Sequence, residues 1–326
     1  LMTREDMSRI LKIVVIIGLI TALYGLKQHY LGLGDVEAYE LKSKHFYKTF
    51  GDEGNVRVMS TFASLGDFSL YLSVAGFLTF AYIWRDKKNL LLTLVFLINV
   101  FSMLWIAVRT SFLLLMFSIM MLIIIHGKSA RQIFLRGIAA FITIALLYGV
   151  LSTYDPQRMY DQDFSANPYV VHTLSGITHP TQENSLKMRL SNWAYIVKTT
   201  ITQHLAGRGL GSTTPAARKF EGGQPFEADS YFFELFYGSG LMAPAVFAFI
   251  VICALWRLMR ICLENPDVYI YKICWGLLCG IFLGSIFGLA ARDTIAGPLA
   301  WMIIGWTVRE DVDGGVRIAR PAEASG

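Results

Sequence analysis

Long blocks of apolar residues constrain the fold of this chain more than any other feature. A helix needs about 20 apolar residues to cross the hydrocarbon core of a membrane. Eight blocks are candidates: residues 10–31, 66–84, 89–107, 110–126, 132–151, 229–256, 269–290 and 294–308. Only 16% of the residues are charged, too few to cover a water-facing surface, which excludes a soluble enzyme. The sequence therefore predicts an all-α polytopic membrane protein with about eight transmembrane helices.

Basic residues between the blocks predict the direction in which the helices run. Lys and Arg gather in the cytoplasmic loops of membrane proteins. If both termini are cytoplasmic, every basic cluster that borders a block falls on that side. These clusters are Arg4, Arg9 and Lys12; Arg85, Lys87 and Lys88; Lys128, Arg131 and Arg136; Arg257, Arg260 and Lys272; and Arg309, Arg317 and Arg320. We therefore expect both termini in the cytoplasm.

This orientation also defines the segments on the opposite, outer side. They are residues 32–65, the turn at Arg109, residues 152–228 and a short turn at Arg292-Asp293. Residues 152–228 form a loop too long to be a simple connector. The expected organisation is five transmembrane helices in 1–151, an outer loop in 152–228, three helices in 229–308 and a cytoplasmic tail in 309–326. From Glu310 to Gly326 this tail is polar, and we expect it to be disordered.

Cysteines and net charge exclude further classes of site. The four cysteines all lie in or between two late apolar blocks: Cys253, Cys262, Cys274 and Cys279. None lies in an outer loop, so we expect no disulfide there, and their spacing does not resemble a zinc site. The net charge of +5 is small and spread over several loops, so nucleic acid is not an expected partner.

The outer loop contains one amphipathic helical pattern. Its apolar positions recur at helical spacing: Leu190, Trp193, Ala194, Val197, Ile201 and Leu205. Such a helix lies on a membrane surface or packs on the bundle. It is expected to end at Gly207-Arg208-Gly209-Leu210-Gly211, where glycines reverse the chain.

Three outer arginines are candidates for binding an anion. Arg109 lies between two apolar blocks, where a charge is costly and indicates function unless the side chain snorkels to lipid headgroups. Arg189 is expected at the start of the amphipathic helix, an unfavourable place for a cation, which indicates either an anionic ligand or an ordinary surface arginine. Arg208 lies among glycines whose N–H groups could form an anion nest, although a helix end followed by a turn is the favoured interpretation.

Outer carboxylates and histidines give further candidates. Asp229 precedes the sixth block, where an aspartate serves as a helix N-cap, as a catalytic base, or as both. Arg292 and Asp293 are expected to stabilise a turn or contact the bundle, with Arg292 adding positive charge. Asp161 and Asp163 have a metal-binding spacing that arises easily by chance. Three histidines lack the spacing of metal ligands: His172, His179 and His204.

Several motifs resemble those of O-antigen ligases and O-antigen polymerases. Over roughly residues 60–250 they follow the family's order: Val108-Arg109-Thr110-Ser111, Arg189-Leu190-Ser191-Asn192-Trp193, Ala206-Gly207-Arg208-Gly209-Leu210-Gly211, Ala228-Asp229-Ser230-Tyr231-Phe232 and Tyr237-Gly238-Ser239-Gly240-Leu241-Met242. Each motif is loose, but the order, the spacing and the large outer loop are together fairly specific. Family members often have more transmembrane helices than this chain, so we expect earlier ones to precede the abrupt start at Leu1-Met2.

The resemblance implies a GT-C-like, inverting glycosyltransferase that needs no metal and no cofactor. Its donor is a glycan on polyprenyl (undecaprenyl) diphosphate, reached from the periplasmic face of the bacterial inner membrane. The family's diphosphate-binding arginines correspond to Arg109 and Arg189, and the outer positions of Arg208 and Arg292 suit the same anion. Asp229 occupies the family's histidine position and is the expected catalytic residue. The supporting residues of these motifs are Trp193, Gly209, Gly211 and Tyr231.

The acceptor distinguishes two alternatives within the family. Ligases that act on lipid A-core usually keep the histidine, whereas polymerases are more variable, so Asp229 favours a polymerase of O-antigen or exopolysaccharide repeats. A transporter or flippase of an anionic lipid or solute is an alternative from another class. It predicts charges near the middle of the membrane. Here the block interiors are almost free of charge and the candidates gather at one face, which favours surface chemistry.

Overall fold

The described part of the protein is helical apart from one pair of two-residue strands. The computed structural model describes residues 2–43, 49–50, 55–56, 58–62, 64–86, 89–106, 108–127, 131–140, 142, 184–209, 211–213 and 228–318. The strands β1 (Thr49–Phe50) and β2 (Asn55–Val56) pair antiparallel. The helical architecture agrees with the all-α prediction.

Helices follow most of the apolar blocks. Four in the described part are long and apolar enough to cross a membrane: α1 (Arg4–Leu31), α3 (Leu65–Arg85), α12 (Met242–Glu264) and α13 (Tyr269–Ile286). Two shorter apolar helices, α4 (Leu90–Ile106) and α5 (Arg109–Ile125), match the third and fourth blocks. Residues 131–140 are helical and lie at the beginning of the fifth block. The apolar helices support a multi-pass membrane protein, and the number of eight spans stays a prediction.

Two predicted boundaries are wrong. The sixth block is not one helix, because the chain breaks at Gly240 into α11 (Tyr231–Ser239) and α12. Gly240 has φ +74°, a left-handed conformation that interrupts a right-handed helix. At the other end of the chain, α14 (Ala296–Ile318) continues well past residue 310. The helix therefore includes the first part of the segment that we expected to be disordered.

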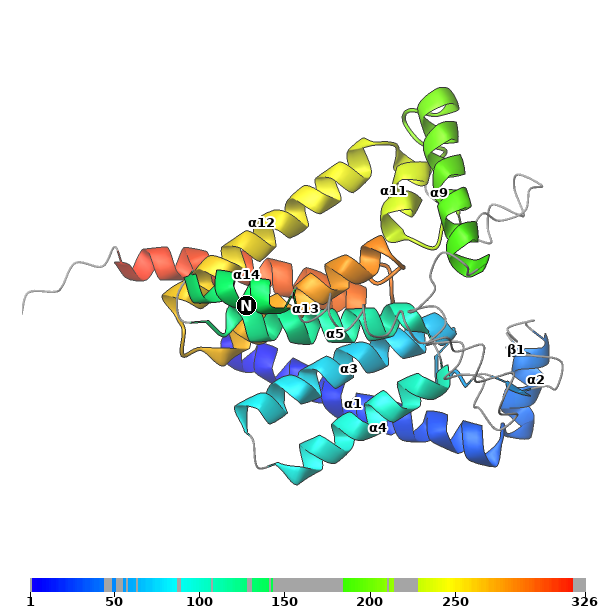
Figure 1. Ribbon diagram of the computed structural model, residues 1–326, viewed down its shortest axis with the longest axis horizontal. Coiled ribbons are helices and arrows are strands. Elements are labelled where there is room, and N and C mark those ends of the chain that lie inside the picture. Colours follow the sequence, from blue (N-terminus) through cyan, green and yellow to red (C-terminus); the bar gives the residue numbers. More distant parts are fainter. Residues whose placement is uncertain are drawn as a thin grey trace, which may run out of the picture.

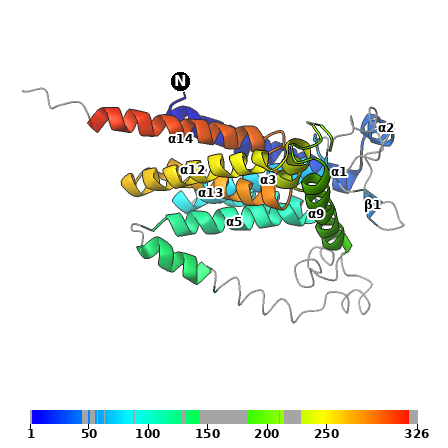
Figure 2. The same cartoon turned by 90° about the horizontal axis from the view of Figure 1, so that it is seen from above.

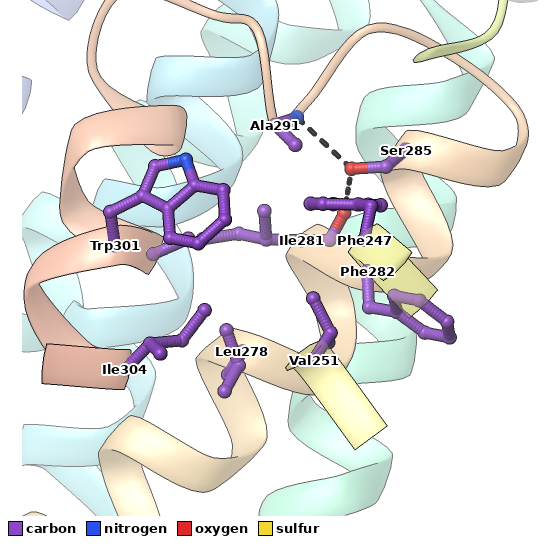
Figure 3. A pocket seen from close by; sticks show the side chains of 10 residues that line it. Phe247, Val251, Leu278, Ile281, Phe282, Ser285, Ala291, Trp301 and Ile304 are labelled. Atoms are coloured by element: carbon purple, nitrogen blue, oxygen red, sulfur yellow. Dashed lines mark hydrogen bonds between the residues drawn. The ribbon is translucent and has the colours of Figure 1, made fainter. Parts of the chain in front are cut away.

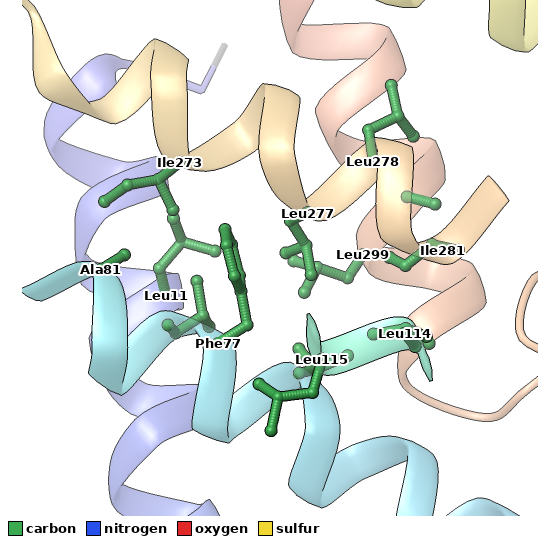
Figure 4. Packing of buried hydrophobic residues seen from close by; sticks show 14 of the residues in the cluster. Leu11, Phe77, Ala81, Leu114, Leu115, Ile273, Leu277, Leu278, Ile281 and Leu299 are labelled. Atoms are coloured by element: carbon green, nitrogen blue, oxygen red, sulfur yellow. The ribbon is translucent and has the colours of Figure 1, made fainter. Parts of the chain in front are cut away.

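The core lies between α3, α5 and α13. Phe77 of α3, Leu115 of α5 and Leu277 of α13 are fully buried in one large apolar cluster (Figure 4). Among the described helices, α5 and α13 share the most extensive contact. Gly276, Gly280 and Gly284 recur every fourth residue on the face of α13 that touches α5. Small residues at this spacing let two membrane helices approach closely.

Cysteine placement agrees with the sequence. All four cysteines are free, with Cys262, Cys274 and Cys279 buried and Cys253 exposed on α12.

The amphipathic helix lies at one end of the bundle. This helix, α9 (Asn184–Gln203), sits with α11 beside the ends of the other helices (Figures 1 and 2), and we call this the α9 end. A short helix, α2 (Asp35–Ser43), follows α1. Arg189 lies beyond the first turn of α9, so the expectation that it opens the helix is wrong. The α9 face that packs on α11 carries Ile196, whereas Leu190 and Ile201 are exposed.

Candidate functional site

Two charged side chains that are far apart in the sequence pair at the α9 end, and a third lies within the range of their charge. Arg189 Nε lies 3.9 Å from Asp229 Oδ2, and both side chains are about one-third exposed. The charge of Arg189 also acts on Arg109, the first residue of α5. Arg189 Nη1 donates to the carbonyl of Phe287 at 3.3 Å, which ties α9 to the end of α13. The structure thus brings together the residues that the sequence assigns to an anion and to a base.

The position of Arg109 is unfavourable for a cation without an anion nearby. It is partly buried at the N-terminus of α5, where no side chain caps the helix. Both the helix dipole and the charge of Arg189 oppose a second positive charge there. Beneath it, Ser111 Oγ donates to Ser69 Oγ at 2.6 Å, and Ser73 Oγ donates to the Ser111 carbonyl at 2.8 Å. These hydroxyls tie the first turn of α5 to α3.

Asp229 has a strained backbone that its neighbours hold in place. Its φ is +51°, a left-handed conformation that residues other than glycine adopt rarely. The residue before it, Ala228, accepts a 2.9 Å hydrogen bond from Trp193 Nε1, and the Trp193 ring stacks on Phe233. Two residues after it, the Tyr231 N–H donates to the Gly288 carbonyl at 2.8 Å. The segment is therefore fixed on both sides of the carboxylate.

The N-cap assignment of Asp229 is wrong. Helix α11 starts one residue later than expected, and Ser230 occupies the N-cap position. The left-handed backbone of Asp229 directs the chain into this cap from outside the helix. Of the two roles considered for Asp229, the N-cap role is excluded because Ser230 holds that position, and the catalytic role stays a prediction.

The glycine-rich turn after α9 forms hydrogen bonds to the backbone of α11. Gly207, Gly209 and Gly211 all have positive φ. The N–H groups of Arg208 and Gly209 donate to the carbonyls of Tyr237 and Gly238 at 2.9 and 2.8 Å. Because these donors are already used, they are not an anion nest. The segment is a turn, as favoured, but the expected helix end is wrong, because α9 ends at Gln203, before the glycines. The Arg208 guanidinium lies over the Tyr237 ring, 5.2 Å from its centroid.

A carboxylate that the sequence reasoning missed lies at the centre of this region. Glu234 Oε1 accepts from Arg292 Nη1 at 2.7 Å and from Thr213 Oγ1 at 3.1 Å. The contact that Arg292 makes is therefore with α11. Glu234 escaped notice because it lies inside an apolar block that we took for one helix. An acidic residue inside such a block is itself a signal of function.

Asp293 stabilises the start of α14. Its Oδ1 atom accepts 2.9 Å hydrogen bonds from the N–H groups of Ile295 and Ala296, which confirms the turn-stabilising role. Burial raises the pKa of the Asp293 carboxyl to about 6. The two backbone hydrogen bonds oppose this rise, and the nearby charge of Asp67 on α3 adds to it.

A small apolar cavity lies beside this region, between α12, α13 and α14 (Figure 3). Among its lining residues, Ser285 is the polar one. Its hydroxyl donates to the Ile281 carbonyl at 2.7 Å and accepts from the Ala291 N–H at 3.0 Å. These bonds fold the connection between α13 and α14 back over the bundle, where it meets α9 and α11.

Several candidates lie elsewhere. Asp161, Asp163, His172 and His179 lie outside the described residues. His204 follows the last residue of α9, and its N–H donates to the Thr200 carbonyl. Within the described ranges, no three His, Cys, Asp or Glu side chains are grouped closely enough to hold a metal ion.

Comparison with protein-family models, curated proteins and solved structures finds no match to this chain.

Proposed function

We propose that this protein is an inverting, metal-independent glycosyltransferase that polymerises oligosaccharide repeats carried on polyprenyl diphosphate. The observation that carries the proposal is the pairing of Arg189 with Asp229 at one end of a bundle of apolar helices, where the charge of Arg189 also acts on Arg109. In the proposed orientation, the α9 end faces the periplasm of a bacterial inner membrane and both termini are cytoplasmic.

The two arginines suit a lipid-linked diphosphate. A guanidinium group binds phosphate oxygens through two parallel hydrogen bonds and keeps its charge at all physiological pH values. Arg109 and Arg189 carry like charges that act on each other, so an anion between them relieves that repulsion. A donor lipid in the membrane would present its diphosphate at the depth of a helix end such as that of Arg109.

Asp229 suits the role of base. The acceptor hydroxyl oxygen forms a bond to the anomeric carbon as the bond from that carbon to the diphosphate oxygen breaks. The hydroxyl proton passes to Asp229, and the diphosphate leaves with the electron pair, stabilised by the arginines. One direct displacement inverts the anomeric centre.

The surrounding residues would hold these groups in position. Trp193 binds the Ala228 carbonyl before Asp229, and the Tyr231 N–H after it binds the Gly288 carbonyl. The turn with Gly209 and Gly211 places Arg208 against Tyr237. A fixed arrangement of reacting groups lowers the barrier, because less entropy is lost when the donor and acceptor come together.

Reconstitution tests the proposal. Purified full-length protein in liposomes would receive a polyprenyl-diphosphate oligosaccharide, and chain length would be read by electrophoresis. We expect a ladder of longer chains that EDTA does not suppress, little elongation by Asp229→Asn, and normal elongation by Asp267→Asn, an exposed aspartate after α12. Elongation by Asp229→Asn at the normal rate would reject the base. Transfer to lipid A-core without elongation would identify a ligase instead.

A further inference from the structure

Glu234, on α11, binds Arg292 in the connection between α13 and α14. We propose that it is a positioning residue, which rests on the proposed function: it fixes α9, the turn to residue 213, Asp229 and α11 against the connection between α13 and α14. We call residues 184–213 and 228–239 together the α9–α11 layer. In this role Glu234 acts through Arg292 and touches no substrate.

Glu234 connects two other segments of the chain through its carboxylate. One oxygen, Oε1, accepts from two donors on different segments, Arg292 Nη1 at 2.7 Å and Thr213 Oγ1 at 3.1 Å. The Glu234 side chain is only 16% exposed, whereas that of Arg292 is 43% exposed. A mostly covered carboxylate with two donors keeps its geometry better than an exposed ion pair does.

The layer meets the bundle through apolar and polar contacts. Ile196, Phe236 and Tyr237 form an apolar cluster within the layer, and Tyr231 and Phe232 of α11 pack on Phe247 of α12. Described polar contacts between layer and bundle reach one short segment. They run from Arg189 to the Phe287 carbonyl, from Tyr231 N–H to the Gly288 carbonyl, from Ser230 Oγ to the Ser285 carbonyl, and from Glu234 to Arg292.

The boundary between the layer and the bundle runs through the candidate site. Arg189 and Asp229 belong to the layer, whereas Arg109 belongs to α5 in the bundle. A shift of the layer along the α13–α14 connection would carry Arg189 and Asp229 away from Arg109. The Glu234–Arg292 pair opposes such a shift. Among the described contacts between the layer and the bundle, it is the contact between opposite charges.

This role differs in its consequences from a role of Arg292 as a ligand of the diphosphate. If Arg292 bound substrate, neutralising Glu234 would free the arginine and donor binding would tighten. If Glu234 positions the layer through Arg292, each single variant weakens the site. Exchanging the two charges restores the site only in the second case.

A charge-exchange experiment tests the proposal in the full-length protein. Spin labels on Lys198→Cys in α9 and Gly305→Cys in α14, with Cys253→Ser, report the distance between layer and bundle. Both labelled positions are exposed, and nothing lies within 4 Å of a Cβ atom at Gly305. The variants are Glu234→Arg, Arg292→Glu, their combination, and Glu234→Gln as the mildest change. Exchanging Glu5 and Arg9, an exposed pair 3.7 Å apart on α1, is the matched control.

We expect one narrow distance distribution in the unsubstituted protein, broad ones in the single variants, and a narrow one in the exchanged pair. Elongation should fall about tenfold in the single variants, with a raised donor KM, and recover in the exchanged pair. The control exchange should change neither. Unchanged distances in Glu234→Arg and Glu234→Gln, or no recovery in the exchanged pair, would overturn the proposal. If the distances respond as expected but the unsubstituted protein elongates nothing, the proposed function fails and the structural role of Glu234 stands.

Discussion

At the scale of single residues, the left-handed backbone of Asp229 lets its structural and chemical roles be tested separately. Asparagine tolerates the left-handed conformation nearly as well as aspartate, whereas a β-branched residue does not. We expect Asp229→Asn to leave stability within about 0.5 kcal/mol and Asp229→Val to lose about 1–2 kcal/mol. Thermal unfolding in detergent would measure both. Equal melting temperatures for the two variants would show that the φ of +51° is not strained.

The Asp293 carboxyl predicts a dependence of stability on pH. Burial raises its folded pKa to about 6, above the unfolded value of about 3.9. The folded state therefore holds the proton more tightly between these values, so stability present at low pH is lost as pH rises from about 4 to about 6. We expect a loss of about 2 kcal/mol across this window and none above it.

The asparagine variant isolates this effect. Asp293→Asn keeps an oxygen that accepts from Ile295 and Ala296, and so keeps the cap, but it does not titrate in this range. Melting temperatures at pH 4 and pH 7 would be compared for the unsubstituted protein, Asp293→Asn and Asp267→Asn. The loss should vanish in the first variant and persist in the second. An equal loss in all three proteins would assign it to other groups.

Individual charged residues were the best predicted part of the candidate site. In an apolar chain a charge needs a reason, and this argument alone selected Arg109. Similar arguments gave Arg189 and Asp229 as candidates, to which the motif resemblance assigned roles, and the structure pairs these two side chains. Glu234 was missed because it lies inside a block taken for one helix, and its partners, Thr213 and Arg292, are far from it in sequence.

At the scale of elements, two glycines allow the turn after α9 to cross the end of α11. A Cβ atom on Gly207 would overlap the Gly238 carbonyl oxygen, and one on Gly240 would overlap the Leu205 carbonyl oxygen. Both glycines also have positive φ. We expect Gly207→Ala and Gly240→Ala each to destabilise the protein by about 3 kcal/mol, since strain and overlap add.

Two further glycines provide controls for this prediction. Gly209 has positive φ but open space around it, so Gly209→Ala should cost only the strain, about 1 kcal/mol. Gly305 lies within α14 in open space, so Gly305→Ala should be neutral or stabilising. Melting temperatures of the four variants should follow this order, and equal losses at Gly207 and Gly209 would refute the close crossing.

Helix positions were largely predictable from the sequence, and their breaks were not. Apolar length predicted α1, α3 and α13 because a membrane span needs a minimum number of residues. The break at Gly240 depends on a crossing with residues after α9, which apolar length does not encode. The glycine repeat of α13 was a readable signal that sequence reasoning overlooked, since Gly276, Gly280 and Gly284 have the spacing of a close helix contact.

At the scale of the whole molecule, the unequal size of the apolar clusters predicts two levels of stability. The α9–α11 layer has a small cluster around Ile196, whereas the bundle has a large one that includes Leu277. Regions with few buried apolar contacts open without global unfolding. We expect Ile196→Ala to increase hydrogen exchange in α9 and α11 while exchange in α3 and α13 stays unchanged.

The matched variant in the bundle is Leu277→Ala. Both substitutions remove a fully buried aliphatic side chain. A change of this kind costs about 2–5 kcal/mol where the surroundings do not collapse. Leu277→Ala should therefore lower the melting temperature of the bundle, and Ile196→Ala should not. Faster exchange in all helices of the Ile196→Ala protein would show that layer and bundle unfold together.

The backbone bonds of the α9–α11 layer have a consequence for how such a surface evolves. Arg208 and Gly209 bind Tyr237 and Gly238 through main-chain atoms, and Tyr231 binds Gly288 in the same way. Main-chain bonds survive the replacement of side chains, provided that the glycines at the crossing are kept. Side chains that would contact a saccharide can therefore be replaced during evolution while the backbone arrangement that positions them is kept.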